Sequence, residues 1–260
     1  MFLLIFITAQ VRAQAQTNVI MAVFAHPDDE IGVSPILHKL STEGHQVYLV
    51  YATDGRKGIT PFSGLKTEEE VAQVRKEEAK CVCNELSIQP PIMLDFADGS
   101  LYEMQVQQKL KQSLTEQLQK LKPNIVLTWG PDGGYGHSDH RMVSNILSDT
   151  YLTDTLNQYK NLYFTGFPSQ RINRSDFQTF GAKWLMANFS FINPKYLNHE
   201  IPYSQKDFNV AAKAYHCYKS QYTPETMNEI LSIIQEAGDL KAYFWTPFLS
   251  DNLLQTITKQ

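Results

Sequence analysis

Short apolar runs alternate along this chain with longer segments in which apolar residues recur every three or four positions. The apolar runs predict buried strands at residues 18–24, 46–51, 92–96, 124–129 and 162–165. Helical spacing is found at residues 31–40, 67–86, 106–121 and again from about residue 138. Strands that alternate with helices indicate an α/β fold, in which helices cover both faces of a mostly parallel sheet. We therefore expect a Rossmann-like architecture with its active site at the carboxyl ends of the strands.

Local signals support several of these boundaries. Thr67 followed by Glu70 is a capping box that opens a helix, and Pro123 ends the helix that precedes it. The pattern then weakens, and irregular chain is expected to about Tyr203. Two further helices are expected after it, at residues 205–219 and 224–237.

The N-terminus carries an apolar run at residues 2–9, followed by the small-residue pattern Ala13-Gln14-Ala15. This order is typical of a signal peptide cleaved after Ala15, although no Lys or Arg precedes the run. The run is too short to span a bilayer, so we expect no integral membrane segment in the mature chain. The expected organisation is a signal peptide at residues 1–15 and a single domain at residues 16–260. Export to the periplasm or the medium follows from the leader, and a cytoplasmic location follows if the run is not a signal peptide.

Composition excludes one class of partner. Of the 260 residues, 43% are hydrophobic and 19% are charged, and the formal net charge is −4, as in an ordinary globular protein. The Lys and Arg residues are interleaved with Glu and form no basic stripe, so no nucleic-acid partner is expected. The sequence gives no indication of the oligomeric state.

The cysteines are Cys81, Cys83 and Cys217, an odd number without the spacing of a zinc ribbon or a disulfide framework. They do not decide the redox compartment. We expect all three to be small buried side chains.

The first candidate site follows the first predicted strand, in the sequence His26-Pro27-Asp28-Asp29-Glu30. Parallel strands place such residues at one edge of the sheet, where binding crevices form. His26 and Asp29 offer a nitrogen and an oxygen to one cation, which leaves Asp28 free for another task. The alternative is an acidic cap that complements the dipole of the next helix.

The second candidate site follows the fourth predicted strand, at residues 133–140, with the sequence Gly-Gly-Tyr-Gly-His-Ser-Asp-His. His137 and His140 are three residues apart and share a face if both lie on the first turn of a helix. One of them can then ligate a metal while the other stands over the substrate. With His26 and Asp29 this makes three protein ligands and one open position, which is typical of a catalytic metal site.

Both segments match the two signatures of the PIG-L/LmbE family of zinc-dependent N-deacetylases, which this chain resembles over most of its length after the leader. Weaker similarities to that family lie at residues 53–58, at Arg75, Glu78 and Leu86, at Asp98, Gly99 and Leu101, and at Lys213, His216, Ser220 and Gln221. The chain departs from the commonest family pattern at Ser138, where Pro is frequent, and at Ser87, where Gly is frequent. Neither departure removes a candidate ligand.

The resemblance implies a metal ion held by His26, Asp29 and His140. Zinc is the expected metal, and Fe²⁺ or Co²⁺ would also accept two imidazoles and a carboxylate. Asp28 would be the general base that takes a proton from the metal-activated water.

The resemblance gives roles to four further side chains. His137 would stabilise or protonate the reacting centre, and Tyr135 would help to polarise the amide carbonyl. Arg75 and Asp98 would contact the sugar or its aglycone.

The activity expected from this resemblance is removal of the N-acetyl group from an N-acetylglucosamine-containing small molecule or glycoconjugate. One alternative is an amidase of a sugar-linked thiol conjugate, and another is a carbohydrate-binding protein of the same fold without turnover. Asp28 and His137 favour the enzyme, because binding alone requires neither. A phosphoesterase is less well supported, since such sites usually hold two metals and need more ligands.

Other polar residues have less informative surroundings. His38 and His45 are expected to be solvated or to cap the first helix, and His216 is expected to have a structural role. Asp132 and Asp139 are expected to orient metal-bound imidazoles through the second ring nitrogen.

Overall fold

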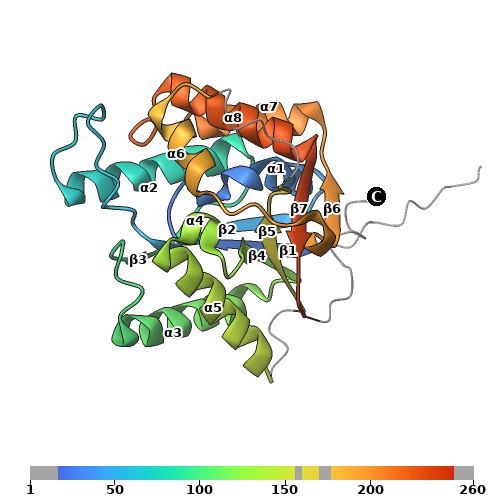
Figure 1. Cartoon of the computed structure of the whole chain (residues 1–260). Helices are drawn as coiled ribbons and strands as arrows, with labels where there is room; N and C mark the ends of the chain where they lie inside the picture. The colour runs from blue at the N-terminus through green and yellow to red at the C-terminus, as the bar shows by residue number, and fades with distance from the viewer. Residues whose placement is uncertain (1–16, 156–159, 170–176, 249–260) are drawn as a thin grey trace, which may run out of the picture.

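A seven-stranded mixed sheet runs through the middle of the protein (Figure 1). The computed structural model describes residues 17–155, 160–169 and 177–248. Within these residues the strand order is β3-β2-β1-β4-β5-β7-β6. The strands are β1 (Val19–Phe24), β2 (Gln46–Thr53), β3 (Ile92–Phe96), β4 (Ile125–Trp129), β5 (Asn161–Gly166), β6 (His199–Pro202) and β7 (Lys241–Trp245).

The first five strands are parallel, and β7 pairs antiparallel with both β5 and β6. β1 lies between β2 and β4, so successive connections run to opposite sides of β1. This reversal creates a crevice at the carboxyl ends of β1 and β4, where ligands bind in open α/β sheets. The expected α/β, Rossmann-like fold is confirmed.

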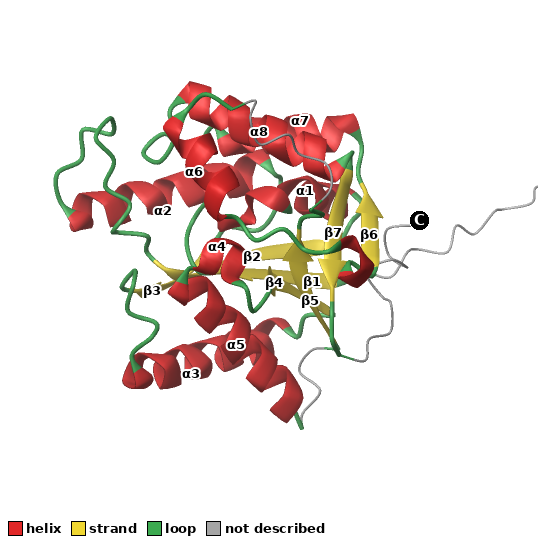
Figure 2. Ribbon diagram, in the orientation of Figure 1, coloured by secondary structure: helices red, strands yellow, loops and turns green. Residues whose placement is uncertain are grey.

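Helices cover both faces of the sheet, as predicted (Figure 2). One face carries α1 (Ser34–Thr42), α2 (Glu68–Glu85), α7 (Gln205–Tyr215) and α8 (Pro224–Gly238). The other face carries α3 (Met104–Leu121) and α5 (Ser138–Thr153). Shorter elements near the crevice are η1 (Asp29–Gly32), α4 (Gly133–Gly136), α6 (Phe180–Asn188) and η2 (Pro194–Tyr196).

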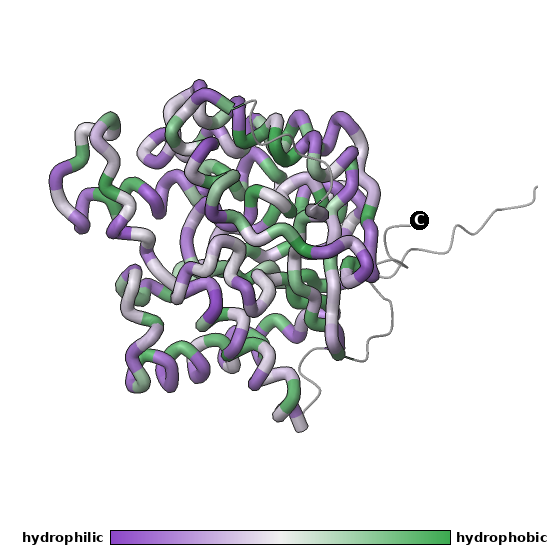
Figure 3. The backbone as a smooth tube through the Cα atoms, in the orientation of Figure 1, coloured by the Kyte–Doolittle hydropathy of each residue, from purple (hydrophilic) through white to green (hydrophobic). Residues whose placement is uncertain are grey.

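The central strand explains why the sequence shows apolar runs and not simple alternation. Ile20, Ala22 and Phe24 pack into the core on the α1 side, whereas Met21 and Val23 pack into the core on the α3 side. Both faces of the strand are therefore buried, which requires a continuous apolar run. Figure 3 shows this as hydrophobic colour along the central strands, whereas α2 and α3 at the periphery alternate between polar and apolar residues.

Two predicted helix boundaries are confirmed. The Thr67 hydroxyl accepts from the backbone N–H of Glu70, and the Glu70 carboxylate accepts from the backbone N–H of Thr67, which is the expected capping box. α3 ends at Leu121, and the left-handed conformation of Lys122 then leads into Pro123.

The region before Tyr203 is more regular than the sequence indicated. It contains α6 and β6, and a further strand, β7, follows α8. β6 is a short edge strand, His-Glu-Ile-Pro, whose sequence has no strand pattern, and it pairs only with β7. β7 lies between β5 and β6 and carries an apolar run, Ala-Tyr-Phe-Trp, that was not predicted as a strand. The first of the two C-terminal helices ends at Tyr215, earlier than predicted.

The expectation for the cysteines is wrong for two of them. Cys81 in α2 and Cys217 after α7 form a disulfide with a Cα–Cα distance of 5.9 Å, and only Cys83 is a free buried thiol. The partners are 136 residues apart in sequence. They meet because α2 and α7 pack side by side on one face of the sheet, which local spacing does not reveal.

The expectation for His38 and His45 is also wrong, because both are buried. His38 Nδ1 lies 2.8 Å from the Asp207 carboxylate and ties α1 to α7, while His45 Nδ1 accepts from the backbone N–H of Asn18. His216 is the C-terminal residue that caps α7, and its side chain is exposed.

The predicted leader, residues 1–15, lies outside the described residues. Among the residues that are described, no helix combines the length and apolar character needed to cross a membrane.

Candidate active site

Turns after two neighbouring strands bring the three predicted metal ligands together. His26 and Asp29 follow β1, and His140 lies in the first turn of α5, after β4. The Nε2 atom of His140 lies 3.0 Å from Asp29 Oδ1 and 3.0 Å from His26 Nδ1. His26 Nδ1 lies 3.6 Å from Asp29 Oδ2. All three side chains are buried at the crevice between β1 and β4.

Outer hydrogen bonds orient the two imidazole rings. Nδ1 of His140 lies 3.0 Å from the Gly133 carbonyl oxygen, and Nε2 of His26 lies 3.0 Å from Asp98 Oδ1. When the rings are neutral and these nitrogens donate, the opposite nitrogen of each ring can bind a cation. Burial lowers the pKa of His26, but hydrogen bonds to Asp139, Asp29 and Asp98 outweigh burial and raise this pKa well above its usual value. A divalent metal ion could take the place of the proton that these acids favour, because two imidazole nitrogens and a carboxylate oxygen are donors that suit it.

The other oxygen of Asp29 is held by the backbone. Asp29 Oδ2 accepts from the N–H groups of Ala25 and His26 at 3.0 and 2.9 Å. Burial raises the pKa of Asp29, but interactions with His140 and His26 outweigh it and lower the pKa well below its usual value. Asp29 is therefore an oriented carboxylate with Oδ1 directed at His140.

A second group of acids surrounds the outer nitrogen of His26. Besides Asp98, the Asp139 carboxylate lies 3.6 Å from His26 Nε2. Asp139 accepts from the N–H groups of Gly99 and Leu101, and Asp98 accepts from that of Lys57. These carboxylates are occupied by backbone donors, so they orient His26 and do not offer a better metal site.

This arrangement supports one of the two carboxylates expected to orient imidazoles. Asp139 lies beside His26 as predicted, whereas Asp132 accepts from the N–H of Gly134 and leaves His140 to the Gly133 carbonyl. The orienting role of Asp98 was not predicted. Although burial raises its pKa, the hydrogen bond from His26 lowers the pKa of Asp98 to about 2.

Asp28 stands next to the three ligands and is held by different partners. Arg75 Nη2 lies 3.1 Å from Asp28 Oδ1, and the Tyr222 hydroxyl donates to Asp28 Oδ2 at 3.0 Å. Its backbone has φ of 102°, a value that residues other than glycine rarely adopt. Burial raises the pKa of Asp28, and the charge of Arg75 opposes that effect. The carboxylate is thus aimed and kept apart from the ligand set, as a general base requires.

Arg75 is buried against the turn that carries Asp28. Its guanidinium also donates to the Pro27 carbonyl, and both contacts fix it beside Asp28. Gly55, with φ of +65°, leaves room for it, because a Cβ there would lie 2.4 Å from Arg75 Nε. Arg75 also lines the cleft, so contact with a sugar stays a prediction.

His137 caps the start of α5 with its ring. Nδ1 accepts from the backbone N–H of Asp139 at 3.2 Å, so Nε2 is the nitrogen that carries a proton. Burial, together with the neighbouring His26 and His140, lowers the pKa of His137 to about 4. Its ring centroid lies 4.7 Å from that of His26 and 4.8 Å from that of His140. His137 is therefore a neutral N–H donor beside the ligand set.

Tyr135 lies against the other side of the same cluster. Its ring centroid is 5.0 Å from that of His140 and 5.1 Å from that of Trp184. Burial raises the pKa of Tyr135, so its hydroxyl keeps its proton and acts as a donor.

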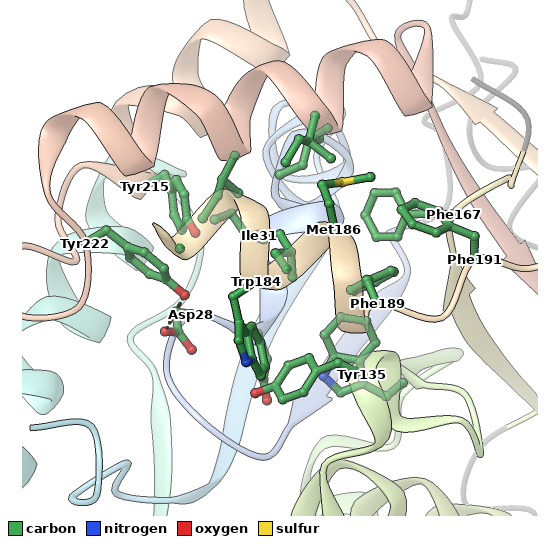
Figure 4. Close-up of a pocket in the computed structure, with 17 residues that line it drawn as sticks. Asp28, Ile31, Tyr135, Phe167, Trp184, Met186, Phe189, Phe191, Tyr215 and Tyr222 are labelled. Carbon is green, nitrogen blue, oxygen red and sulfur yellow. Dashed lines mark hydrogen bonds between the residues drawn. The ribbon is translucent and has the colours of Figure 1, made fainter. Parts of the chain in front are cut away.

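Two cavities meet at this cluster. A polar cleft is lined by His26, Asp28, Gly55, Lys57, Gly58, Arg75, Asp98, Gly99, Tyr102, Tyr135, His137, Ser138, Gln221 and Tyr222. An apolar pocket adjoins it on the side of α6 and α8, shown in Figure 4. All the side chains predicted to act on the substrate line the polar cleft.

A family model described as GlcNAc-PI de-N-acetylase (PIG-L) matches residues 21–151 of the 260. The chain belongs to the PIG-L family. The matched segment contains the three candidate ligands. It also contains Asp28, Tyr135 and His137, and it ends before the helices α6 to α8.

Curated members of the PIG-L family match about half of this chain. A 1D-myo-inositol 2-acetamido-2-deoxy-alpha-D-glucopyranoside deacetylase from Corynebacterium diphtheriae is 31% identical over 155 residues, which are 48% of this chain and 50% of that protein. A diacetylchitobiose deacetylase from Thermococcus kodakarensis is 32% identical over 124 residues, 47% of this chain and 45% of that protein. A mycothiol S-conjugate amidase from Streptomyces coelicolor is 28% identical over 145 residues, 49% of each chain. The chain thus spans about half the length of the curated relatives it matches.

Solved structures share the fold over a larger part of the chain. The N,N'-diacetylchitobiose deacetylase from Pyrococcus horikoshii has a TM-score of 0.64 at 20% identity, covering 87% of this chain and 82% of that one. A 4-carboxy-2-hydroxymuconate hydratase from Pseudomonas putida has the same TM-score at 15% identity, covering 91% and 99%. Because one of these is a hydratase, the PIG-L fold by itself does not fix the reaction.

Three contacts of the PIG-L site were not predicted from the sequence. The Trp129 ring stacks on His140 with centroids 5.3 Å apart, and Tyr222 holds Asp28. Glu30 accepts from the hydroxyls of Tyr51 and Tyr218, and burial raises the pKa of Glu30 to about 7. The aromatic partners lie far away in the sequence, so no local motif predicts these contacts. The acidic run at residues 28–30 marked Glu30 itself but not its partners.

Two residues of the weaker PIG-L similarities, Arg75 and Glu78, lie on α2. Residues 75, 78 and 81 follow one another at a spacing of three and face the C-terminal segment. Glu78 accepts from both the backbone N–H and the hydroxyl of Ser220, and Cys81 is bonded to Cys217. Gln221 then donates to the Gly58 carbonyl. These residues brace the walls of the cleft.

Proposed function

We propose that this protein is a metal-dependent hydrolase that removes the N-acetyl group from an N-acetylglucosamine-containing substrate. The observation that carries the proposal is the convergence of His26, Asp29 and His140, whose donor atoms lie 3.0 to 3.6 Å from one another, beside an aimed carboxylate at Asp28. The deacetylase names of the relatives support the same reaction class.

The residues suited to hold the metal are His26, Asp29 and His140. Zinc is the proposed ion, with Fe²⁺ or Co²⁺ as alternatives that suit the same donors. A bound ion of this kind supplies Lewis acidity, which makes a water acidic near neutral pH and polarises an amide carbonyl.

The chain's own side chains then move protons and stabilise charge. Asp28 is the general base, because its carboxylate faces the cleft and takes no part in the ligand set. Arg75 and Tyr222 hold both of its oxygens, so its position is fixed before the substrate arrives. When the carbonyl carbon becomes tetrahedral, the N–H of His137 and the hydroxyl of Tyr135 can donate to the new oxyanion. As the oxyanion collapses and the C–N bond breaks, Asp28 passes the proton that it took from the water to the departing amine, and acetate is released. One such donor is typically worth about 10² to 10³ in rate.

Cleavage of a sugar-linked thiol conjugate is the second candidate. The mycothiol S-conjugate amidase among the relatives favours it, because it matches the same half of the chain as the deacetylases. Both reactions hydrolyse the amide on the sugar nitrogen. The acyl group that leaves is acetyl in the first reaction and the thiol conjugate in the second.

The experiment is a panel of amide substrates offered to the zinc-loaded protein. N-acetylglucosamine, N,N'-diacetylchitobiose and an N-acetylglucosaminyl inositol are incubated with the enzyme, and released acetate is measured. We expect acetate from at least one of them, released about 10² to 10⁴ times more slowly by Asp28→Asn. A wild-type protein that binds these sugars but releases no acetate would support the binding-protein alternative and overturn the proposed activity.

We also propose that the protein is exported. The apolar leader with Ala13-Gln14-Ala15 supports this, and so does the Cys81–Cys217 disulfide, because disulfides persist in oxidising compartments. Mass spectrometry of the natively expressed protein should find a chain that starts near Gln16. An intact Met1 on the mature protein would contradict export by this leader.

A further inference from the structure

An apolar pocket of about 210 Å³ adjoins the candidate active site (Figure 4). Its walls come from η1, α6, α8 and the segment between α6 and η2, and they are mostly aromatic and aliphatic. Phe167, Phe189 and Phe191 lie together at one end of the view in Figure 4, and Leu185, Met186 and Ile230 also line the pocket. An engineered apolar cavity of about 150 Å³ holds benzene, so this pocket has room for a chain of six or more carbons.

The pocket opens directly onto the reacting groups. Asp28, Tyr135 and Tyr222 line both this pocket and the polar cleft, and Asp29 lines the pocket as well. Figure 4 shows the hydroxyl of Tyr222 directed at Asp28, with the aromatic side chains beyond it. A molecule whose reactive carbon lies next to Asp28 can therefore extend into both cavities.

We infer that this pocket binds the acyl chain of the substrate, so that the preferred substrate is an amino sugar whose nitrogen carries an acyl group longer than acetyl. This inference rests on the proposed hydrolysis of an N-acylated amino sugar, and it changes the preferred acyl group from acetyl to a longer chain. An acetyl group would place a single methyl at the pocket mouth and leave most of the apolar walls without a partner.

The chemistry of the two cavities assigns the two sides of the amide. The polar cleft offers Arg75, Asp98, Lys57 and Gln221, which suit the hydroxyl groups of a sugar. The apolar pocket offers few polar groups, and burying sugar hydroxyls there without partners would be costly. The nitrogen side of the amide therefore belongs in the cleft and the carbonyl side in the pocket, with the carbonyl carbon between them near Asp28.

The test is a chain-length series on one sugar. Glucosamine carrying N-acetyl, N-butanoyl, N-hexanoyl and N-octanoyl groups is offered to the zinc-loaded protein, and the free amine is measured. Each buried methylene should raise kcat/KM by about threefold to fourfold until the pocket is full. The gain should lie mainly in KM, because the chain makes the same contacts in the ground and transition states.

Two tryptophan substitutions on α6 provide a matched pair. Leu185→Trp introduces a larger side chain at the pocket wall, whereas Ala187→Trp adds the same ring at an exposed position of the same helix. We expect Leu185→Trp to lower the ratio of kcat/KM for hexanoyl over acetyl at least tenfold. Ala187→Trp should leave the wild-type ratio and the basal activity unchanged.

The results separate this inference from the proposed function. Hydrolysis of the acetyl substrate with no gain for longer chains would overturn the acyl pocket and leave the deacetylase proposal intact. A gain that follows the alkyl chain of an N-acetylglucosamine alkyl glycoside would assign the pocket to the aglycone and also overturn the inference. If no member of the series is cleaved, both proposals are overturned.

Discussion

Arg75 and Asp28 form an ion pair at 3.1 Å that is almost completely shielded from solvent, with side chains 4% and 14% exposed. The carboxylate that we assign as the base is thus held by a cation from α2, a helix that contributes no metal ligand. The pair links the chemistry of the site to the stability of the fold. It can be tested from both ends.

Asp28→Asn should lower kcat by about 10² to 10⁴, the usual contribution of positioned acid-base catalysis. The amide keeps the size of the side chain and removes the group that takes the proton. Metal content, measured by elemental analysis, should stay at the wild-type level. Deacetylation at the wild-type rate by the zinc-loaded variant would rule out Asp28 as the base.

Arg75→Met should destabilise the protein by about 3 to 5 kcal/mol, because it leaves a buried carboxylate without its cation. The matched control is Lys111→Met, which removes an ion pair with Asp149 whose side chains are both exposed. That change should cost no more than about 1 kcal/mol. Urea unfolding of both variants measures the difference, and equal losses would show that the Arg75 pair has no special weight.

His140→Ala should lose most of its bound metal, because it removes one of three ligands. His38→Ala is the control, since His38 is also a buried histidine bonded to a carboxylate but lies outside the site. It should retain metal near one equivalent. If His140→Ala still binds one equivalent of metal, His140 is not a ligand.

Reduction of the Cys81–Cys217 disulfide should lower the free energy of unfolding by about 2 to 4 kcal/mol. The bond closes a long loop and ties α2 to the segment that carries Ser220. Thermal unfolding with and without reductant measures the effect. The double variant Cys81→Ser, Cys217→Ser should unfold at the same temperature with and without reductant. If reductant lowers its unfolding temperature as much as that of the wild type, the effect belongs to another group.

Asp207 should make the fold sensitive to acid. Burial raises its pKa, but hydrogen bonds from Ser204 and His38 outweigh that effect, and the pKa of Asp207 is lowered. A lowered folded-state pKa gives stability that is present above the unfolded pKa of about 3.9 and is lost as the pH falls through the folded value. Asp207→Asn should therefore lose less stability than the wild type between about pH 5 and pH 3. Parallel pH curves for the two proteins would contradict this.

The first half of the fold was readable from the sequence because its strands are buried on both faces and its helices carry clear end signals. Thr67 and Glu70 mark the start of α2, and the apolar run of β1 marks the centre of the sheet. β6 was missed because its sequence, His-Glu-Ile-Pro, has no strand pattern and its conformation depends on pairing with β7. β7 carries a local signal, the apolar run Ala-Tyr-Phe-Trp, that the interpretation of the sequence did not use.

The same contrast holds in the site. His26, Asp29 and His140 lie in compact motifs after strands, so topology alone brings them together. The partners that hold them lie elsewhere. Trp129 stacks on His140, and Tyr222 reaches Asp28 from 194 residues away in the chain. Such contacts depend on tertiary packing, and their partners form no local sequence motif from which they could be predicted.

The family match at residues 21–151 contains all three proposed metal ligands, whereas α6 and α8, which wall the apolar pocket, lie beyond it. The proposed hydrolysis and the inferred selectivity for the acyl group would thus depend on successive stretches of the polypeptide. Exchange of residues after position 151 can reshape the pocket while the ligand set stays untouched. Members of one family can in this way diversify the amides they accept while inheriting a single hydrolytic apparatus.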